Sequence, residues 1–420
     1  MHYAVKVNLL LAAYCLLFSS YVFAGELTLR DLIDEALKNS PEILASQYRA
    51  SASGYRIPQA KSLPDPMFMF GYQNEGWNRY SFGDMQMSWW MFSASQMIPF
   101  PGKLALKGEM ASKESEGLRA SYESSRLKVV TRVKELYFDL FLAYRNIDLI
   151  RERTALFSKI EDAAVARYSS GMGLQQEVLM AQTEKYMLLE KEEMQKQRIQ
   201  SLEAMLNAAL GREVSSPLGR PAEPSSNAYV RDMDALLRMA YENSPEIRSR
   251  QKMIGAAEVK VRMAEKEYYP DFTFTGNVMK RTGEFEDMWS LTTAINVPIF
   301  YRTKQRQAVN EAKASLSEAR SELEAAKLMV ASNMRDNHSM MKTAERLMEL
   351  YRDGLIPKTY QDFEASLAGY VTGKVEAITV ISRLKALLDF ETFYWGQFVE
   401  REKAAARLEA LAGIMEAGGK

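Results

Sequence analysis

The chain carries one ordered set of short motifs twice, about 200 residues apart. Asn39–Ile43 reads Asn-Ser-Pro-Glu-Ile, and the same five residues return at Asn243–Ile247. A repeat of this length is too long for one unit of a solenoid, so each half must be a sizeable structural motif. We therefore expect a duplicated architecture with a pseudo-two-fold relation between its halves. The other repeated motifs are Pro64-Asp65 with Pro270-Asp271, Ile98-Pro99 with Val297-Pro298, and Tyr168-x-x-Gly171 with Tyr370-x-x-Gly373.

The N-terminus has the layout of a secretory signal. Lys6 precedes an apolar run from Val7 to Val22, and Ala24 ends a plausible cleavage site. The run is short for a retained transmembrane anchor. Cys15, the only cysteine, follows Tyr14 rather than a small residue, which argues against lipidation. We expect residues 1–24 to be a cleaved signal peptide, and the mature chain to be exported without a lipid anchor.

The charge balance excludes one class of partner. Lys plus Arg and Asp plus Glu both total 54, so the chain has no net basic field to attract nucleic acid. No segment after the signal offers 18 uninterrupted apolar residues, so we expect no helix that crosses a membrane. The mature chain is then either soluble in the periplasm or inserted in an outer membrane as strands.

Two regions, about 66–98 and about 271–297, alternate with period two and predict a pair of β-hairpins. Arms of about ten residues suffice to cross a bilayer when the strands are tilted. In the second hairpin the alternation separates polar from apolar residues, and we expect the polar set to line water and the apolar set to face lipid. The polar set is Thr273, Thr275, Asn277, Ser290, Thr292 and Asn296, and the apolar set is Phe272, Phe274, Leu291 and Ile295.

Four strands cannot close a membrane barrel, because the smallest have about eight. An open sheet edge in hydrocarbon costs several kcal/mol for each unpaired group. The chain must therefore share a barrel with copies of itself. Two copies would supply eight strands and three would supply twelve. The number of strands alone does not decide between these two possibilities.

Long helical hairpins follow each strand pair, at about 103–210 and about 304–412. Apolar residues keep a 3-4 spacing typical of coiled-coil seams, from Val129 to Ile150 and from Val309 to Val330. A helix of about 65 residues would extend roughly 100 Å, deeper than any globular core. We expect continuous helices at Leu29–Ala60 and Met233–Tyr268. The repeats would span 25–210 and 229–415, joined by a linker at 211–228. The turns that end the long helices contain Tyr168, Gly171, Gly173, Tyr370, Gly373, Lys374 and Glu376.

This layout resembles the TolC-like outer-membrane efflux family over nearly all of the mature chain. The resemblance rests on the duplicated Asn-Ser-Pro-Glu-Ile, on Pro298-Ile299-Phe300 and on the Tyr-x-x-Gly turns. Ser95–Lys103 and Asp65-Pro66-Met67 are most similar to the heavy-metal efflux branch. The resemblance implies a homotrimer with a twelve-stranded β-barrel continued by an α-helical barrel. It also implies a periplasmic membrane-fusion adaptor and an inner-membrane pump of the resistance-nodulation-division type, or less often an ABC exporter.

Nothing in the sequence suggests an enzyme or a cofactor site. The mature chain has no cysteine and one histidine, His338, so a zinc site of the usual kind is not expected. Methionine is abundant, with 25 residues. Those around the first hairpin could offer thioethers to Cu(I) or Ag(I). We favour a role as adaptable apolar filling, on the expectation that alternation places them on both faces of the arms. They are Met67, Met69, Met85, Met87, Met91 and Met97.

These observations favour a passive exit duct through the outer membrane and periplasm, with metal ions or small toxic compounds as cargo and the Gly turns as docking tip and gate. A type I secretion duct is one alternative. A soluble periplasmic coiled-coil scaffold or adaptor is another, and it would leave four strand arms of membrane length unexplained.

Overall fold

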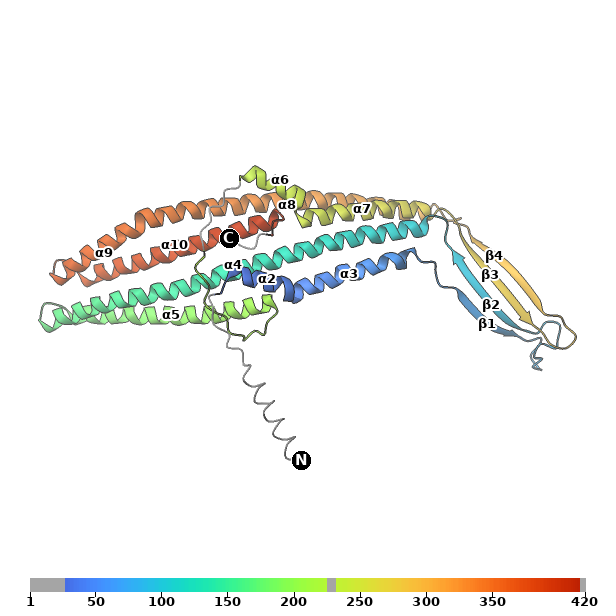
Figure 1. Ribbon diagram of the computed structural model, residues 1–420, viewed down its shortest axis with the longest axis horizontal. Coiled ribbons are helices and arrows are strands. Elements are labelled where there is room, and N and C mark those ends of the chain that lie inside the picture. The colour runs from blue at the N-terminus through green and yellow to red at the C-terminus, as the bar shows by residue number, and fades with distance from the viewer. Residues whose placement is uncertain (1–26, 225–231, 416–420) are drawn as a thin grey trace, which may run out of the picture.

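The structure, a computed structural model, describes residues 27–224 and 232–415. The expected signal peptide and Cys15 lie outside these ranges, as does part of the expected linker. The molecule is elongated, with all strands at one end and two helix-to-helix turns at the other (Figure 1). The two halves of the chain lie side by side along its length.

Each repeat runs helix, helix, strand, strand, long helix, turn, helix. The first repeat contains α2 (Leu29–Asn39), α3 (Pro41–Lys61), β1 (Met67–Gln73), β2 (Trp89–Ile98), α4 (Lys103–Ser169) and α5 (Gln175–Leu210). The second contains α6 (Met233–Asn243), α7 (Pro245–Lys266), β3 (Asp271–Lys280), β4 (Met288–Asn296), α8 (Gln305–Leu350), the π-helix η1 (Tyr351–Leu355), α9 (Ile356–Val371) and α10 (Ala377–Leu411).

The duplicated Asn-Ser-Pro-Glu-Ile motif breaks a helix in each repeat. Our expectation of continuous helices at Leu29–Ala60 and Met233–Tyr268 was wrong, because Ser40 and Ser244 leave the helical region, with ψ of 121° and 120°. A residue before proline is pushed away from the α conformation, while proline itself fits the first turn of the next helix. The motif therefore stops one helix and starts the next.

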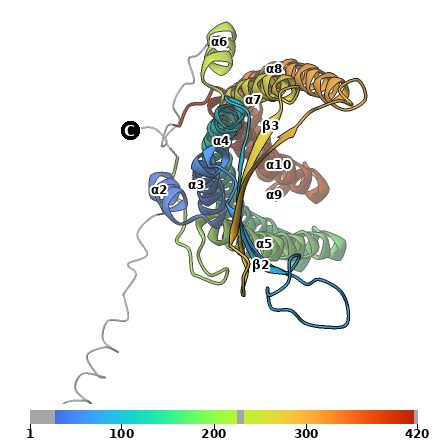
Figure 2. The ribbon, with the colours of Figure 1, turned by 90° about the vertical axis from the view of Figure 1, so that its right-hand side faces the viewer.

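The four strands form one antiparallel sheet in the order β1-β2-β3-β4. β2 pairs with β3 across the two repeats, so the duplicated halves share a single sheet. The end-on view shows this sheet as a curved layer (Figure 2). The first hairpin is less regular than expected, since β2 begins at Trp89 and Met85–Ser88 belong to the preceding turn. The outer edges of β1 and β4 have no strand neighbour in the described chain.

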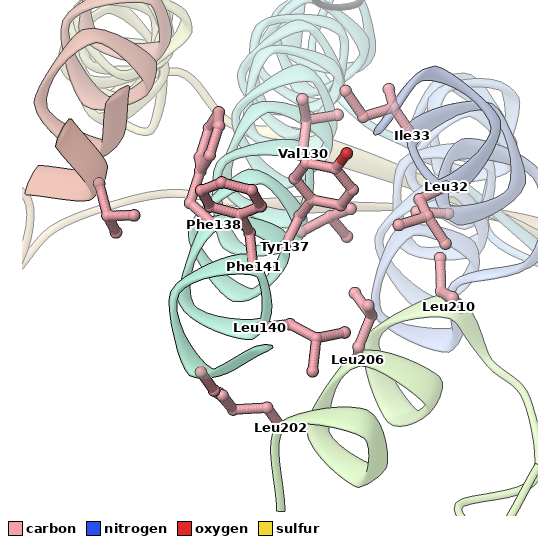
Figure 3. Packing of buried hydrophobic residues seen from close by; sticks show 14 of the residues in the cluster. Leu32, Ile33, Val130, Tyr137, Phe138, Leu140, Phe141, Leu202, Leu206 and Leu210 are labelled. Carbon is pink, nitrogen blue, oxygen red and sulfur yellow. The ribbon is translucent and has the colours of Figure 1, made fainter. Parts of the chain in front are cut away.

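One cluster of buried apolar residues lies where α2 packs against α4 and α5 (Figure 3), midway along the molecule (Figure 1). Leu32 and Ile33 of α2 meet Leu140 of α4 and Leu206 of α5, and each is at most 1% exposed. The expected seams are present: Val133 and Ile147 on α4 are buried, as is Ala312 on α8. Alanine at such positions lets neighbouring helices approach closely, as the packing of long helices requires.

The second long helix is interrupted, whereas α4 is continuous for 67 residues. Between α8 and α9 the backbone forms the π-helix η1, which ends two residues before Pro357. Proline has no backbone N–H and its ring crowds the preceding turn, so the helix widens there by one residue. The repeat is therefore not exact along this helix.

Candidate functional site

The polar residues expected to line water share one face of the sheet. Residues directly opposite each other in an antiparallel pair point to the same side. Thr275 lies opposite Thr292, and Asn277 lies opposite Ser290, whose Oγ accepts a hydrogen bond of 3.0 Å from Asn277 Nδ2. Strand alternation puts Thr273 and Asn296 on the same side. We name this side, together with its continuation over β1 and β2, the polar face.

The opposite side of the sheet is apolar and rich in aromatic residues. Phe272 lies opposite Ile295, and alternation adds Phe274 and Leu291 to their side. On β1 and β2 the same side carries Phe70 stacked on Trp90, with ring centroids 5.3 Å apart, and Phe92 and Tyr72 beside them. Leu291 is 72% exposed and Trp289 79% exposed in the single chain. A large apolar surface of this kind marks a contact with lipid or protein.

The methionines of the first hairpin do not divide between the two faces. Met67 lies opposite Ser95 and Met69 opposite Ser93, while β2 pairs these serines with Thr275 and Asn277. Met91 and Met97 of β2 are an even number of residues from these serines, so their side chains point to the same side of the sheet. All four therefore lie on the polar face, and the expectation that the strands spread them over both faces was wrong. Met85 and Met87 precede β2 and belong to the turn.

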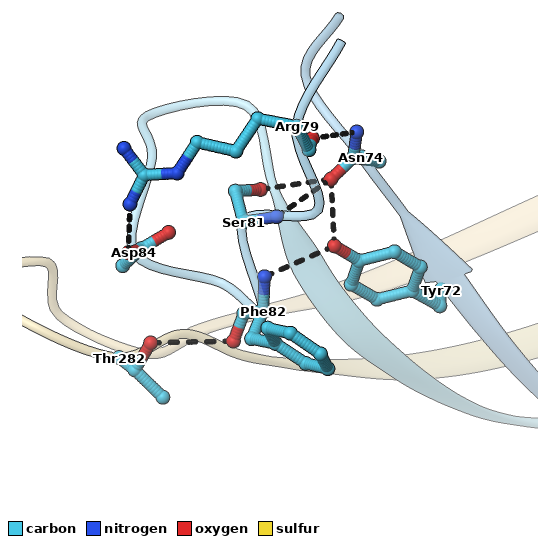
Figure 4. Close-up of polar contacts among 7 residues, drawn as sticks. All are labelled: Tyr72, Asn74, Arg79, Ser81, Phe82, Asp84 and Thr282. Carbon is cyan, nitrogen blue, oxygen red and sulfur yellow. Dashed lines mark hydrogen bonds and ion pairs between the residues drawn. The ribbon is translucent and has the colours of Figure 1, made fainter. Parts of the chain in front are cut away.

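The hairpin loops at the far end of the sheet are tied together across the repeats (Figure 4). The Tyr72 hydroxyl donates to Asn74 Oδ1 at 2.8 Å and accepts from the Phe82 N–H at 3.1 Å. Thr282 of the second hairpin donates its hydroxyl to the Phe82 carbonyl at 3.2 Å. These bonds fix how the two hairpins lie relative to each other at this end.

A buried ion pair joins the repeats where the sheet meets the helices. Lys103, the first residue of α4, is 3% exposed, and its Nζ lies 2.9 Å from Asp271 Oδ1 at the start of β3. The Phe100 N–H donates to the same oxygen at 2.8 Å, and Lys103 also donates to the Tyr269 carbonyl at 3.1 Å. We name this cluster of four residues the inner corner. Each charged group in it has hydrogen-bond partners, as a buried pair requires.

The repeat supplies counterparts of Asp271 and Lys103, but these two counterparts lie far apart. Asp65 is the counterpart of Asp271 in the repeated Pro-Asp. Lys304 is the counterpart of Lys103, since the same offset relates buried Ala111 to buried Ala312. Asp65 precedes β1 and Lys304 follows β4, at opposite edges of the sheet. Both are exposed, and neither has an ion-pair partner within residues 27–224 and 232–415. We name these two residues the outer corner.

The far tips of the helices end in matched glycine turns. Gly171 and Gly373 have φ of +73° and +77°, the left-handed region that glycine adopts most readily. In each turn the next residue donates its N–H five residues back, from Met172 to Arg167 and from Lys374 to Gly369, both at 2.9 Å. This is the Schellman arrangement expected at a helix end.

The two tips of the chain are held together by a residue that the sequence did not single out. Arg167 donates to the Tyr370 carbonyl at 2.6 Å, and its guanidinium lies over the Tyr370 ring at 4.8 Å. Tyr370 is fully buried and donates its hydroxyl to Glu177 at 3.1 Å. Burial and the bond to Glu177 raise the pKa of Tyr370 to about 12. Arg167 and Glu177 belong to one hairpin and Tyr370 to the other, so this cluster fastens both hairpins.

The remaining tip residues behave differently from Tyr370. Tyr168, its repeat counterpart, is 49% exposed. Lys374 and Glu376 are exposed, with no ion pair in the part of the chain that the structure describes. Gly173 packs closely, because an added Cβ would lie 2.9 Å from the Arg167 Cβ. The repeat thus produces one buried tyrosine and one that remains available for contacts.

The described residues contain no group of three or more His, Cys, Asp or Glu side chains able to hold a metal ion. Within the same ranges, no helix combines the length and apolarity needed to cross a bilayer.

Comparisons with known proteins agree with this geometry. The chain is 21% identical over 402 residues to the cobalt-zinc-cadmium resistance protein CzcC of Cupriavidus metallidurans, covering 93% of this chain and 91% of that protein. It is 19% identical to the outer membrane protein TolC of Vibrio cholerae, over 88% of this chain and 86% of that protein.

Solved structures share the fold. VceC from Vibrio cholerae superposes with a TM-score of 0.77 at 17% identity, covering 92% of this chain and 96% of that one. CusC superposes with a TM-score of 0.78 at 14% identity, covering 95% of this chain and 96% of that one. The family model described as outer membrane efflux protein matches residues 32–212 and 236–391, most of both repeats. The chain belongs to the outer membrane efflux protein family and acts as an outer-membrane efflux channel.

Proposed function

We propose that three copies of the chain form a passive exit duct, with a twelve-stranded barrel in the outer membrane and a helical tube in the periplasm. An inner-membrane pump of the resistance-nodulation-division type supplies the energy, and a periplasmic adaptor docks at the glycine tips. The duct itself has no enzymatic step. The polar face of the sheet lines water, and the apolar face contacts lipid.

The observation that carries this proposal is a four-stranded sheet with one apolar face and two open edges. A bilayer has no water to satisfy the edge N–H and C=O groups of β1 and β4, so these edges must pair with other strands. Pairing β4 of one copy with β1 of the next closes the sheet without any new element. Three copies give twelve strands, within the range of known membrane barrels.

The outer corner supports the same closure. When β4 of one copy pairs with β1 of its neighbour, Lys304 of the first copy lies close to Asp65 of the second. The two residues are then placed as Lys103 and Asp271 are within one chain. The inner corner then shows the geometry expected at every interface between copies. A charge pair that is buried only in the assembly would also select for the correct edge-to-edge register.

The cargo class proposed is metal ions or small toxic compounds. The support is the name of the relative from Cupriavidus metallidurans, a cobalt-zinc-cadmium resistance protein that aligns over nearly the whole chain. Selection among cargoes rests mainly with the pump, because a passive duct accepts what is delivered to it.

Reconstitution tests the duct directly. Purified protein added to a planar bilayer should give stable ohmic steps, and its mass in detergent should be three times that of the chain. Membranes should retain the protein after washing with carbonate. A monomer that washes off membranes and gives no conductance would support a soluble periplasmic scaffold and overturn the proposal.

The gate is tested at the tips. Cys15 is the only cysteine and lies in the expected signal, so introduced cysteines would be the only ones in the mature chain. Pairs at Tyr168 and Lys374 that bridge neighbouring copies should abolish export on oxidation and restore it on reduction. Unimpaired export by a mutant with verified cross-links would rule out opening at this end.

A further inference from the structure

We propose that methionine thioethers on the polar face form a track that binds soft monovalent cations, Cu(I) or Ag(I), along the barrel wall. This inference deepens the proposed function and rests on the polar face lining the duct. Every methionine in the four strands lies on that face. The set is Met67 and Met69 on β1, Met91 and Met97 on β2, Met279 on β3 and Met288 on β4.

Three of these methionines form a row across adjacent strands. Met91 lies directly opposite Met279, and Met279 lies directly opposite Met288. Side chains so placed have Cβ atoms about 5 Å apart, and the long thioether arms can converge on one ion. All three are half-buried in the single chain. The fourth position of the row, on β1, is Gly71, where an added Cβ would touch the Met91 methyl at 3.4 Å. Glycine there leaves room for the Met91 side chain.

Further methionines continue the track toward the helices. Met69, Met67 and Met97 occupy the three successive rows below, level with Asn277, Thr275 and Thr273. Rows two residues apart along a strand are separated by about 7 Å, and diagonal neighbours on adjacent strands by about 7–8 Å. Each thioether therefore lies within a short step of the next over the four rows.

The choice of face argues against methionine as filler. Filler for lipid or for strand packing belongs on the apolar side, which here carries Phe70, Phe92, Val278 and Leu291 but no methionine within the four described strands. The methionines instead alternate with serine, threonine and asparagine on the side that meets water. Thioethers on that side are placed to meet an ion that passes through the water-filled duct.

The ligand chemistry selects the ion. Thioethers are neutral and soft, and they favour Cu(I) over cations that prefer oxygen or nitrogen ligands. Ag(I) shares this chemistry. The polar face carries no carboxylate beyond Asp271 at its base, so divalent oxygen-seeking ions find no charged ligand along it. Several weak neutral sites in series hold an ion without trapping it, as conduction requires.

The test uses the full-length channel in detergent, in chloride-free nitrate buffer, with Ag(I) as the probe. The variant carries Met91→Leu, Met279→Leu and Met288→Leu, which preserve volume and apolarity. A matched control carries Met187→Leu, Met194→Leu and Met205→Leu, three exposed methionines on α5. Titration calorimetry measures affinity, and silver X-ray absorption reports sulfur ligands.

The row variant should bind Ag(I) at least about tenfold more weakly and show fewer sulfur neighbours around each silver ion, while the control matches the unmodified protein. Equal affinity and scattering in the row variant would overturn the proposal. Bilayer conductance in potassium nitrate separates this outcome from failure of the duct itself. The control variant should conduct like the unmodified channel, and an unmodified protein that does not conduct would instead refute the proposed function.

Discussion

The inner and outer corners contain the same repeated residue types but differ in whether one chain can complete them. At the inner corner Lys103 and Asp271 lie 2.9 Å apart, almost fully shielded from water. At the outer corner Asp65 and Lys304 are exposed at opposite edges of one sheet. Duplication made two equivalent junctions, and only the one between the repeats closes within the chain. Under the proposed closure of the barrel, the other is completed by a second copy.

The largest effect is expected from breaking the completed corner. Asp271→Ala leaves the Lys103 ammonium buried, with the partly exposed Glu267, 3.3 Å away, as its one remaining ion-pair partner among the described residues. Removing one partner of a buried pair costs roughly 3–5 kcal/mol, and Glu267 keeps the loss near the lower end. Chemical denaturation followed by the helical circular dichroism signal measures it. Glu267→Gln is the control, and its loss should stay below about 1 kcal/mol. Equal losses in the two variants would mean that the Lys103–Asp271 pair does not stabilise the corner.

Charge reversal sharpens the comparison at the outer corner. Asp65→Lys or Lys304→Asp alone places like charges together at each interface and should weaken the trimer. The double reversal restores an attractive pair, with a coupling energy of about 1–2 kcal/mol at each interface. Analytical ultracentrifugation in detergent gives the trimer fraction. Additive losses in the double variant would show that the two residues do not meet.

The glycine turns provide a second matched pair of sites. Gly171→Ala should cost about 1 kcal/mol, because alanine at positive φ is strained. Gly373→Ala should cost more, since its Cβ would also lie 3.3 Å from an Arg167 nitrogen, whereas nothing lies within 4 Å of the new atom at Gly171. Chemical denaturation measures both losses, provided that the dependence of stability on denaturant concentration is the same in the two variants. A larger loss at Gly171 would contradict the described contact.

The smallest effect is expected from the two tip tyrosines. Tyr370→Phe removes the bond to Glu177 and should cost about 1 kcal/mol, while Tyr168→Phe should be neutral. The pKa of Tyr370 is raised to about 12, so the folded state favours the protonated phenol. Its contribution is complete below the unfolded pKa near 10 and is lost as pH rises toward 12. Tyr370→Phe should remove that part of the alkaline loss of stability, and an unchanged pH profile would exclude Tyr370 as its source.

Much of this fold could be predicted from the sequence, because period-two and 3-4 spacing report local geometry directly. The polar and apolar sets of the second hairpin separate as alternation predicts. The break at Ser40-Pro41 was missed, since apolar periodicity continues across it. The π-helix before Pro357 was missed for a similar reason, because the 3-4 spacing of apolar residues is present both before and after it.

The methionines show where alternation alone is insufficient. Parity along one arm is readable, but whether Met67 and Met91 share a face depends on the register between the arms. The turn between the arms sets that register, and the register could not be predicted because the stretch before Trp89 is irregular. Arg167 was missed because its repeat counterpart is Gly369, so the duplicated pattern gave no signal for it.

Cross-linking of the outer corner tests the central claim most directly. Within one chain Asp65 and Lys304 flank β1 and β4, three strand spacings or about 14 Å apart, too far for a disulfide. In membranes, Asp65→Cys with Lys304→Cys should therefore oxidise to covalent dimers and trimers and stop at the trimer, and neither single variant should do so. If the double variant is inserted in the membrane and conducts but stays an uncross-linked monomer after oxidation, closure of the barrel through this corner is contradicted.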